Sequence, residues 1–398
     1  MVLKGLKVVE FASYIAAPGA AGIMADWGAQ VIKVERPQGD PMRHAFADAK
    51  SEITINPTFD MDNRGKRAVV LDISKPEGRD ALAKLAAEAD VFLTNVRPAS
   101  LKRAGLDDVT LRATNPRLVY AVVTGYGLEG PDAHLPGFDV TAFWSRAGVA
   151  RMHTPKGQDP FILRTGVGDH TTSLATVSAI LAALYERERT GVGRLVQTSL
   201  LATGVYAVGS DLAVQLVLGR VASNRPRSDP FDPVANFYKS RDERWFVLNP
   251  RGQSGDWALI TAACGRPDLA DDDRFKSGKL RKANSQALVA EFEAAFGALD
   301  FDEIAARLDG ADLVWAPVQT PAEVSADPQV QASGAIVEVE DGQGGIFRSP
   351  AAPARFPGAD SDRRPPAPRL GQHTHEVLAE LGYSPAQIEA MVSAGAAV

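Results

Sequence analysis

The sequence is poor in cysteine and in aromatic residues. Its 398 residues include one cysteine, Cys264, which cannot form a disulfide within its own chain and therefore suits a reducing compartment. Phe, Trp and Tyr make up only 7% of the residues, whereas glycine and alanine are plentiful. A core with so few aromatic rings must be filled by closely packed helices and by contacts between small side chains.

The chain also lacks long apolar runs and an excess of basic charge. No stretch of about 18 apolar residues is present, and charges interrupt the first ten positions, so we expect neither a membrane span nor a signal peptide. Because 49 Asp and Glu outnumber 43 Lys and Arg, the net charge of −6 argues against binding to nucleic acid or to an anionic membrane. We therefore expect a soluble cytoplasmic protein of the size of an enzyme, with two or three domains.

The first half of the sequence alternates short apolar segments with helical ones. The expected strands are residues 6–11, 30–35, 68–72, 90–94, 118–124 and 194–198. The expected helices are residues 19–27, 76–87 with Ser74 as the N-cap, 171–189 and 200–218. Apolar strands separated by helices predict a parallel α/β sheet that is covered on both faces.

The pattern changes near residue 226, where a smaller α+β region is expected. Its strands are residues 237–238 and 245–248, and its amphipathic helices are residues 256–264, 282–296 and 301–308. A proline-rich linker at 363–368 and two short helices at 375–381 and 385–393 follow.

Two features mimic other kinds of site. Residues 125–130 match G-x-G-x-x-G, but Pro131 follows at once and no helix start faces the loop, so we interpret it as a glycine-rich loop rather than a dinucleotide site. The first strand–helix turn lacks the glycine triplet that such a site needs. His373 and His375 have no acid or cysteine cluster beside them, so no metal site is expected.

Residues 166–172 (GVGDHTT) are the most informative segment. Asp169 follows two glycines at the start of a long apolar helix. One interpretation is a helix N-cap that accepts backbone N–H bonds. The other is a carboxylate nucleophile, which flanking glycines leave accessible and helix-start amides assist. Basic residues earlier in the chain either hold a polyphosphate or are ordinary surface charges; they are Lys33, Arg36, Arg43, Arg97 and Arg103.

The ordered blocks of the sequence resemble those of the class III CoA-transferases, the formyl-CoA and carnitine CoA-transferase type. They are residues 3–10 (LKGLKVVE), 28–37 (GAQVIKVERP), 39–41 (GDP), 63–67 (NRGKR), 71–72 (LD), 95–98 (NVRP), 125–131 (GYGLEGP), 136–139 (PGFD), 168–169 (GD), 265–269 (GRPDL), 316–318 (APV), 327–328 (DP), 370–374 (LGQHT) and 381–383 (LGY), together with Leu106. The blocks cover nearly the whole chain, and their order is kept.

This resemblance implies an α/β fold with a Rossmann-like large domain and a smaller α+β domain. The large domain is expected over residues 1–226 and 326–398, and the small one over residues 227–325. The resemblance also implies a homodimer in which two chains interlock as linked rings. It implies no metal and no cofactor, since coenzyme A is a substrate, with an acyl-CoA donor and a carboxylic acid acceptor as partners.

In the mechanism that the resemblance implies, Asp169 attacks an acyl-CoA thioester. A mixed acyl-aspartyl anhydride and an aspartyl-CoA thioester follow, and CoA passes to the acceptor, or between two carboxyls of one diacid. Asp139 stands where formyl-CoA transferase has a glutamate near the nucleophile. The residues matched to CoA contacts are Ile15, Ala16, Arg36, Leu71, Asp72, Ile73, Ser74, Asn95, Val96, Arg97 and Arg103.

The alternative of the same fold is an α-methylacyl-CoA racemase. That enzyme carries a histidine before the middle aspartate, where this chain has Phe138, and phenylalanine cannot transfer a proton. His170 remains a possible substitute base. Two other classes stay open: a CoA-binding protein without catalysis, and a nicotinamide oxidoreductase.

The acyl donor and acceptor are not identified by these residues. Trp144, Arg146, Arg151 and His153 are candidates for selecting the acyl group, with loop packing as the alternative. The loop 249–255 corresponds to a glycine-rich active-site cover in formyl-CoA transferase, and its Arg251 could offer a cation to an acidic acceptor. Pro250 stiffens that loop, so its closure is left open.

Overall fold

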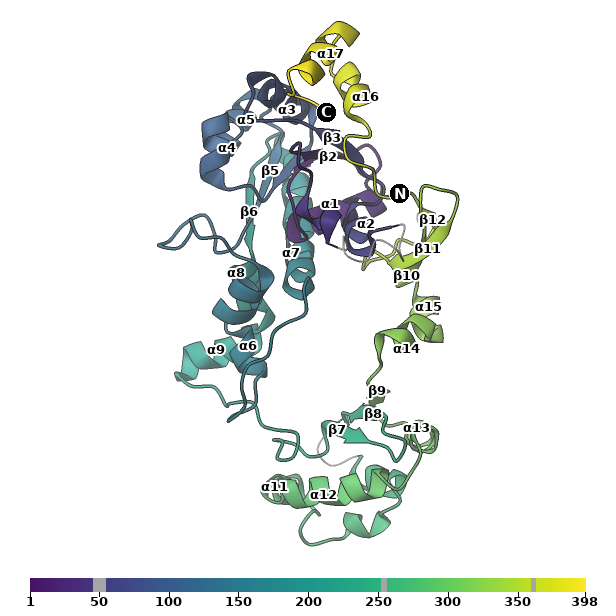
Figure 1. The fold of residues 1–398 in the computed structure, drawn as a ribbon. Helices are drawn as coiled ribbons and strands as arrows, with labels where there is room; N and C mark the ends of the chain where they lie inside the picture. Colours follow the sequence, from purple (N-terminus) through teal and green to yellow (C-terminus); the bar gives the residue numbers. More distant parts are fainter. Residues whose placement is uncertain (46–54, 252–255, 359–362) are drawn as a thin grey trace. The chain divides into compact units, whose positions relative to one another are not determined.

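The computed structural model describes residues 1–45, 55–251, 256–358 and 363–398. Within them the chain forms two compact units (Figure 1). Unit 1 consists of Met1–Arg151, Phe161–Val221 and Gln331–Val398, and unit 2 consists of Met152–Pro160 and Ala222–Val330. Unit 1 is thus discontinuous in sequence. Unit 2 includes residues 152–160, a segment expected in the large domain.

A six-stranded parallel sheet organises unit 1, and this confirms the expected α/β class. Its strands are β1 (Lys7–Phe11), β2 (Gln30–Glu35), β3 (Arg67–Val70), β4 (Val91–Thr94), β5 (Val119–Thr124) and β6 (Leu195–Ser199). They lie in the order β3-β2-β1-β4-β5-β6. The strand order reverses between β1 and β4, and open parallel sheets bind ligands beyond the carboxyl ends of the strands at such a point.

Each face of the sheet is covered by helices. On one face α1 (Ala16–Asp26) and α7 (Val167–Thr190) pack together over an apolar cluster that includes Met24 and Ile180. On the other face a second cluster includes Leu82 of α3 (Pro76–Glu88), Phe92 and Leu378. Small side chains at the start of α1 allow its close approach to α7, as the scarcity of aromatic rings led us to expect.

Residues from the end of the sequence complete the free edge of β3. The backbone N–H of Asp72 donates to the carbonyl of Ala396 at 2.9 Å, and Leu71 forms a bridge with Ala397. Two helices pack nearby, α16 (Thr374–Glu380) and α17 (Pro385–Ser393) (Figure 1). Thr374 accepts the backbone N–H of Val70 through its hydroxyl at 3.1 Å.

Shorter elements connect these parts. They are η1 (Pro41–His44), α2 (Pro57–Asn63), α4 (Pro98–Ala104), α5 (Asp108–Thr114), η3 (Asp139–Arg146, a π-helical turn), α6 (Val149–His153), α8 (Leu200–Ala207) and α9 (Gly209–Leu218). A second sheet in unit 1 has the order β11-β10-β12, with β10 (Ile336–Glu340), β11 (Ile346–Pro350) and β12 (Arg363–Arg364).

Two local expectations are wrong. The helix expected over residues 200–218 breaks at Val208, whose φ of −102° and ψ of 22° leave the helical range, so α8 and α9 are bent by 78°. Ser74 does not cap α3, because its hydroxyl donates to Asp72 and Lys75 occupies the N-cap. Among the described residues no single helix meets the length and hydropathy of a membrane span, and α8 and α9 meet them only when counted together.

Unit 2 combines a small antiparallel sheet with helices. Its strands are β7 (Asn236–Lys239), β8 (Trp245–Leu248) and β9 (Trp315–Pro317). The helices of this stretch of the chain are α10 (Trp257–Ala263), η4 (Pro267–Ala270), α11 (Gly278–Ala283), α12 (Ser285–Phe296), α13 (Phe301–Gly310), α14 (Pro321–Ala326) and α15 (Pro328–Ser333). Its core contains Tyr238, Phe246, Phe292 and Phe296, so part of the limited aromatic content gathers here.

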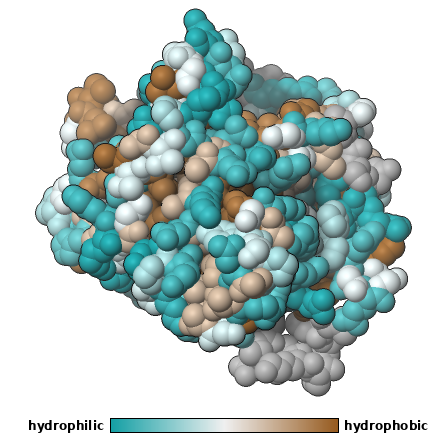
Figure 2. Space-filling view, turned by 90° about the horizontal axis from the view of Figure 1, so that it is seen from above, coloured by the Kyte–Doolittle hydropathy of each residue, from teal (hydrophilic) through white to brown (hydrophobic). Residues whose placement is uncertain are grey.

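Figure 2 views the molecule from above. This face is mostly hydrophilic, with separate groups of hydrophobic side chains between the polar ones. Such a mixture is ordinary for a protein surface, where apolar atoms still contribute a large share of the exposed area.

Candidate active site

The loops that follow four neighbouring strands lie together at the carboxyl ends of the strands of the large sheet. This side of the sheet is called its carboxyl edge below. Ile15 and Ala16 follow β1, Arg36 follows β2, residues 71–74 follow β3 and residues 95–97 follow β4. Because these strands are parallel and adjacent, their carboxyl ends meet at this edge. The structure therefore brings these expected CoA-contact residues to a common edge.

Contacts between the loops fix this edge. The side chain of Asn95 forms two hydrogen bonds with the backbone of Ser13. Its oxygen accepts the Ser13 N–H at 3.0 Å, and its NH2 group donates to the Ser13 carbonyl at 2.6 Å. Hydrogen bonds from Ser74, assisted by the charges of Lys75 and Arg36, lower the pKa of Asp72. The positive charge of Arg36, which follows β2, thus helps to stabilise the charged form of Asp72 in the loop after β3.

Asp169 is the third residue of α7 and not its N-cap. The cap is Gly166, whose φ of 94° is a left-handed conformation that favours glycine. Gly168 is required for packing, because a Cβ added there would stand 2.7 Å from the Cγ of Phe143. The N-cap interpretation of Asp169 is therefore wrong, since the helix begins two residues earlier than the aspartate.

Asp139 holds the start of α7 in place. Its Oδ2 accepts the backbone N–H of Gly166 at 2.9 Å, and its Oδ1 accepts the N–H of Val140 at 2.7 Å. Only 4% of Asp139 is exposed. The structure thus places both aspartates of the predicted catalytic pair at the start of one helix.

His170, the residue after Asp169, contacts a buried aspartate on α2. Its Nε2 lies 3.1 Å from Oδ1 of Asp62, a contact that raises the pKa of His170 while burial opposes the rise. The sequence analysis missed Asp62, because 108 positions separate it from His170 and no local spacing relates them. The contact shows that the imidazole has a fixed partner.

Burial is the largest cause that raises the pKa of the Asp169 carboxyl, to about 7. The negative charge of Asp139 and, to a lesser extent, that of Asp62 raise this pKa further, whereas His170 lowers it. A carboxylate that is neither well solvated nor paired with a cation is poorly stabilised in its charged form. Such groups are candidates for catalytic work in a cleft.

The basic residues of the first half divide into two groups. Lys33 is wholly buried and donates to Glu10 at 2.7 Å and to Asp40 at 2.9 Å, so it is unavailable to a phosphate. Arg43 forms a two-pronged ion pair with Glu35 and is equally occupied. The expectation that these two could hold a polyphosphate is wrong.

The other three arginines stay exposed in unit 1. They are Arg36, Arg97 and Arg103, and the last donates to the hydroxyl of Ser100 at 3.1 Å. Arg36 and Arg97 follow β2 and β4, and Arg103 lies in α4, the helix that follows β4. Guanidinium groups with this exposure are suited to bind phosphate oxygens.

The proposed acyl-selecting residues have other partners. Trp144 is buried and donates its indole N–H to the carbonyl of Phe161 at 2.8 Å. Arg146 pairs with Asp132 and lies over Tyr126. Arg151 and His153 fall in different units, so no shared role is assigned to them.

The loop 249–255 is described only in part. Residues 252–255 lie outside the described residues, and Arg251 forms a double ion pair with Asp312 at 2.8 and 3.0 Å. Its guanidinium therefore already has a carboxylate partner within unit 2.

Two motifs carry no ligand chemistry in the described parts of the chain. Turns, not a helix, follow β5 at residues 125–135, which agrees with the interpretation of a glycine-rich loop. His373 accepts the backbone N–H of Ala68 through Nδ1 at 3.1 Å. No group of three or more metal-ligating side chains is found within the described ranges.

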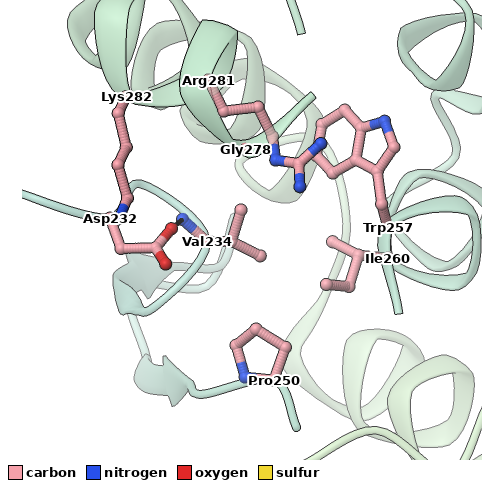
Figure 3. A pocket seen from close by; sticks show the side chains of 8 residues that line it. All are labelled: Asp232, Val234, Pro250, Trp257, Ile260, Gly278, Arg281 and Lys282. Carbon is pink, nitrogen blue, oxygen red and sulfur yellow. Dashed lines mark hydrogen bonds between the residues drawn. The ribbon is translucent and has the colours of Figure 1, made fainter. Parts of the chain in front are cut away.

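A small pocket lies in unit 2 (Figure 3). Its Arg281 lies 4.5 Å from the ring centroid of Trp257 and donates to the carbonyl of Phe275 at 2.9 Å. Asp232 accepts the N–H of Val234 at 3.1 Å. Two polar side chains of this pocket, Arg281 and Asp232, thus already have partners within unit 2. The carboxyl edge of the large sheet therefore remains the candidate active site.

Comparisons with known proteins agree across the whole chain. A family described as CoA-transferase family III matches residues 3–374. The (R)-2-hydroxy-4-methylpentanoate CoA-transferase of Clostridioides difficile is 34% identical, over 98% of this chain and 97% of its own. The cinnamoyl-CoA:phenyllactate CoA-transferase of Clostridium sporogenes is 33% identical, over 98% and 95%. A crystal structure of a CAIB/BAIF family protein from Brucella suis is similar with a TM-score of 0.84 and 32% identity, over 95% of this chain and 99% of that one.

Proposed function

Because the chain belongs to CoA-transferase family III, we propose that it moves CoA from an acyl-CoA thioester to a carboxylic acid, with Asp169 as the nucleophile. Its relatives at 33% and 34% identity are CoA-transferases over nearly its whole length, and it is an enzyme of that kind. The single observation that carries the mechanistic proposal is the placement of Asp169 in the first turn of α7, with a pKa raised to about 7.

The first half of the reaction transfers CoA to the enzyme. The Asp169 carboxylate attacks the thioester carbonyl, the C–S bond breaks, and CoA leaves as a thiolate. The thiolate then attacks the aspartyl carbonyl of the mixed anhydride, which releases the donor acid as a carboxylate and leaves an aspartyl-CoA thioester. No proton is gained or lost, and a covalent intermediate divides one difficult exchange into easier steps.

The second half reverses these steps with the acceptor. The acceptor carboxylate attacks the aspartyl carbonyl, CoA thiolate leaves again, and it attacks the acceptor side of the new anhydride. The products are the acceptor's CoA thioester and the free Asp169 carboxylate. Each attack builds negative charge on a carbonyl oxygen, and backbone N–H groups in the first turn of a helix can stabilise such charge.

The neighbours of Asp169 have assigned roles in this proposal. Asp139 fixes the start of α7 and keeps the pKa of Asp169 raised, which makes the carboxylate a better nucleophile when it is ionised. His170, held by Asp62, limits that rise. Of the matched CoA contacts, Ile15 and Ala16 border pantetheine, and Arg36, Arg97 and Arg103 meet the phosphates.

The two relatives named above act on 2-hydroxy acids with a branched or aryl side chain. We propose substrates of the same class for this chain. No observation favours the racemase alternative, because Phe138 has no exchangeable proton and His170 is already hydrogen-bonded to Asp62.

We also propose that two chains form an interlocked homodimer. The support comes from α9, which has no buried residue and exposes Leu216, Val217 and Leu218 by 78%, 81% and 62%. Adjacent apolar side chains with this exposure typically mark a surface that another chain covers. Light scattering on the purified protein should give twice the mass of one chain; the mass of a single chain contradicts the proposal.

The covalent step can be tested on tryptic peptides. Trypsin cuts after Arg164 and Arg187, and the resulting peptide 165–187 contains Asp169 as its only aspartate. Asp139 lies on a different peptide, 118–146. Protein incubated with the CoA thioester of 2-hydroxy-4-methylpentanoate and then with hydroxylamine should carry a hydroxamate on peptide 165–187.

Two variants control this experiment. Asp169→Asn should lose both the hydroxamate and CoA transfer, whereas Asp139→Asn should still form the hydroxamate. Full CoA exchange by Asp169→Ala, or a label on peptide 118–146 alone, rejects Asp169 as the nucleophile.

A further inference from the structure

Two exposed aromatic side chains meet in unit 1, although neither was singled out as a contact residue from the sequence. Tyr14 and Phe138 are 43% and 53% exposed, and their rings pack edge to face with centroids 5.4 Å apart. The pair thus offers a joined apolar surface to a ligand, since aromatic rings provide a large contact area.

The pair lies beside the start of α7. Phe138 directly precedes Asp139, which accepts the N–H of Gly166. Tyr14 directly precedes Ile15, whose Cδ1 lies 3.8 Å from the position of a Cβ on Gly166. Each ring therefore belongs to the residue that precedes one lying against Gly166, and the contact between the rings joins these two segments.

Both rings stand on fixed backbone. Tyr14 has a φ of 69°, a conformation that is costly for a bulky residue, and its N–H donates to Oδ1 of Asp40 at 3.0 Å. Phe138 donates its N–H to the hydroxyl of Thr141 at 2.9 Å. Strained residues that the surrounding structure holds in place gather at binding and catalytic sites.

The charges around Asp169 indicate what such a surface can accept. The charged groups that act on the Asp169 carboxyl are Asp139, His170 and Asp62, and His170 is already paired with Asp62. A second carboxylate of a substrate would therefore meet the aspartates that hold Gly166 and His170 in place.

We propose that Tyr14 and Phe138 form the wall that receives the side chain of the acyl group, and that they select apolar aryl or branched-alkyl acids over dicarboxylates. The inference rests on the proposed CoA-transferase function and assigns its specificity to these two residues. Aromatic side chains provide a large and rigid apolar surface, which suits a planar ring or a branched chain. The residues expected earlier to select the acyl group, such as Trp144 and Arg146, are occupied elsewhere.

Identity exchange tests the proposal without knowledge of the natural pair of substrates. Each CoA thioester is mixed with its own deuterated acid, and the label that enters the thioester is followed by mass spectrometry. The acids are phenyllactate, 2-hydroxy-4-methylpentanoate and glutarate. Wild-type protein should exchange the two apolar acids with a higher kcat/KM than glutarate.

The variants are Phe138→Ala and Tyr14→Gly. Tyr14→Gly removes the ring and also relieves the left-handed strain, so a folding defect is not its expected effect. In either variant kcat/KM for the apolar acids should fall about 10-fold or more, with less than about a 3-fold change for glutarate. Tyr14→Phe keeps the ring and should resemble wild type. Tyr185→Ala removes a 70% exposed tyrosine near the far end of α7 and should change no ratio.

The outcomes separate the two proposals. Absence of exchange for every acid in wild type rejects the proposed function and this inference with it. Exchange in wild type with glutarate preferred, or ratios in Phe138→Ala and Tyr14→Gly within about 2-fold of wild type, overturns the inference and leaves the proposed function standing.

Discussion

The carboxylate of Asp139 accepts the backbone N–H of Gly166 at 2.9 Å, and this bond fixes a buried negative charge at the cap of the helix that carries Asp169. A helix start normally favours the charged form of a nearby acid. Here the charge of Asp139 and the burial of Asp169 outweigh that effect, since the pKa of Asp169 is raised to about 7. The residue that fixes the helix cap is thus also one that raises the pKa of Asp169.

Asp139→Asn should move the acid limb of the pH profile to lower pH. The nucleophile must be ionised, so the wild-type rate should fall as the pH drops below about 7. Asparagine keeps an oxygen for the Gly166 N–H but removes the negative charge that raises the pKa of Asp169. The measurement is kcat/KM for identity exchange between pH 5 and 9; an acid limb at the wild-type position contradicts the role of Asp139.

Asp169→Asn should make the protein more stable at pH 8. The pKa of Asp169 is higher in the folded state than its ordinary value of 3.8, so stability is lost as the pH rises from about 4 through about 7 and the buried acid ionises. A shift of about three pKa units corresponds to at most ~4 kcal/mol. Urea unfolding at pH 5 and pH 8 measures the difference, and the exposed Asp80→Asn on α3 is the control. An equal gain at both pH values contradicts the prediction.

Arg36→Ala and Arg97→Ala should weaken the binding of CoA thioesters. Each arginine follows a strand at the edge proposed to hold CoA, and hydrogen bonds to charged groups contribute about 1.5–3 kcal/mol. KM for the acyl-CoA should rise about 10-fold or more while kcat changes little, and the difference should shrink at high salt. Arg117→Ala is the matched control, because Arg117 precedes β5 and so lies at the amino ends of the strands, on the side of the sheet away from the proposed CoA site. Equal effects of all three variants argue against a phosphate role.

Lys33→Met should destabilise the protein strongly. Lys33 joins Glu10 and Asp40 in a fully buried network, and its removal leaves Asp40 without that partner. Breaking a buried pair from one side costs about 3–5 kcal/mol. Urea midpoints measure the loss, and Lys7→Met is the control, because its pair with Glu88 is exposed and worth about 1 kcal/mol or less. A similar loss in both variants shows that the network is not a special source of stability.

The sequence predicted the elements that repeat a simple pattern. β2 and α17 begin and end at the expected residues, since an apolar strand between polar turns and a serine-capped helix are local signals. The break at Val208 was missed because continuous apolar residues predict one helix, while tertiary packing decides whether it bends. Lys33 was interpreted as either a polyphosphate ligand or a surface charge, and both are wrong, because it is buried and paired with Glu10 and Asp40. A lysine inside an apolar parallel strand indicates such a buried partner.

The candidate site was predictable in part. Asp169 and Asp139 follow from family blocks in the sequence, and the structure places them at one helix start. Asp62 and Tyr14 were missed. Asp62 reaches His170 only through folding, and the left-handed backbone of Tyr14 has no sequence signal for a residue other than glycine.

The pairing of Leu71 and Asp72 with Ala397 and Ala396 has a consequence for synthesis on the ribosome. Translation makes β3 more than 300 residues before the segment that completes its edge. During that interval the edge strand presents unpaired backbone groups, which are templates for association with other strands. We therefore expect nascent chains stopped before residue 370 to bind chaperones at this edge, and full-length chains to be released from them.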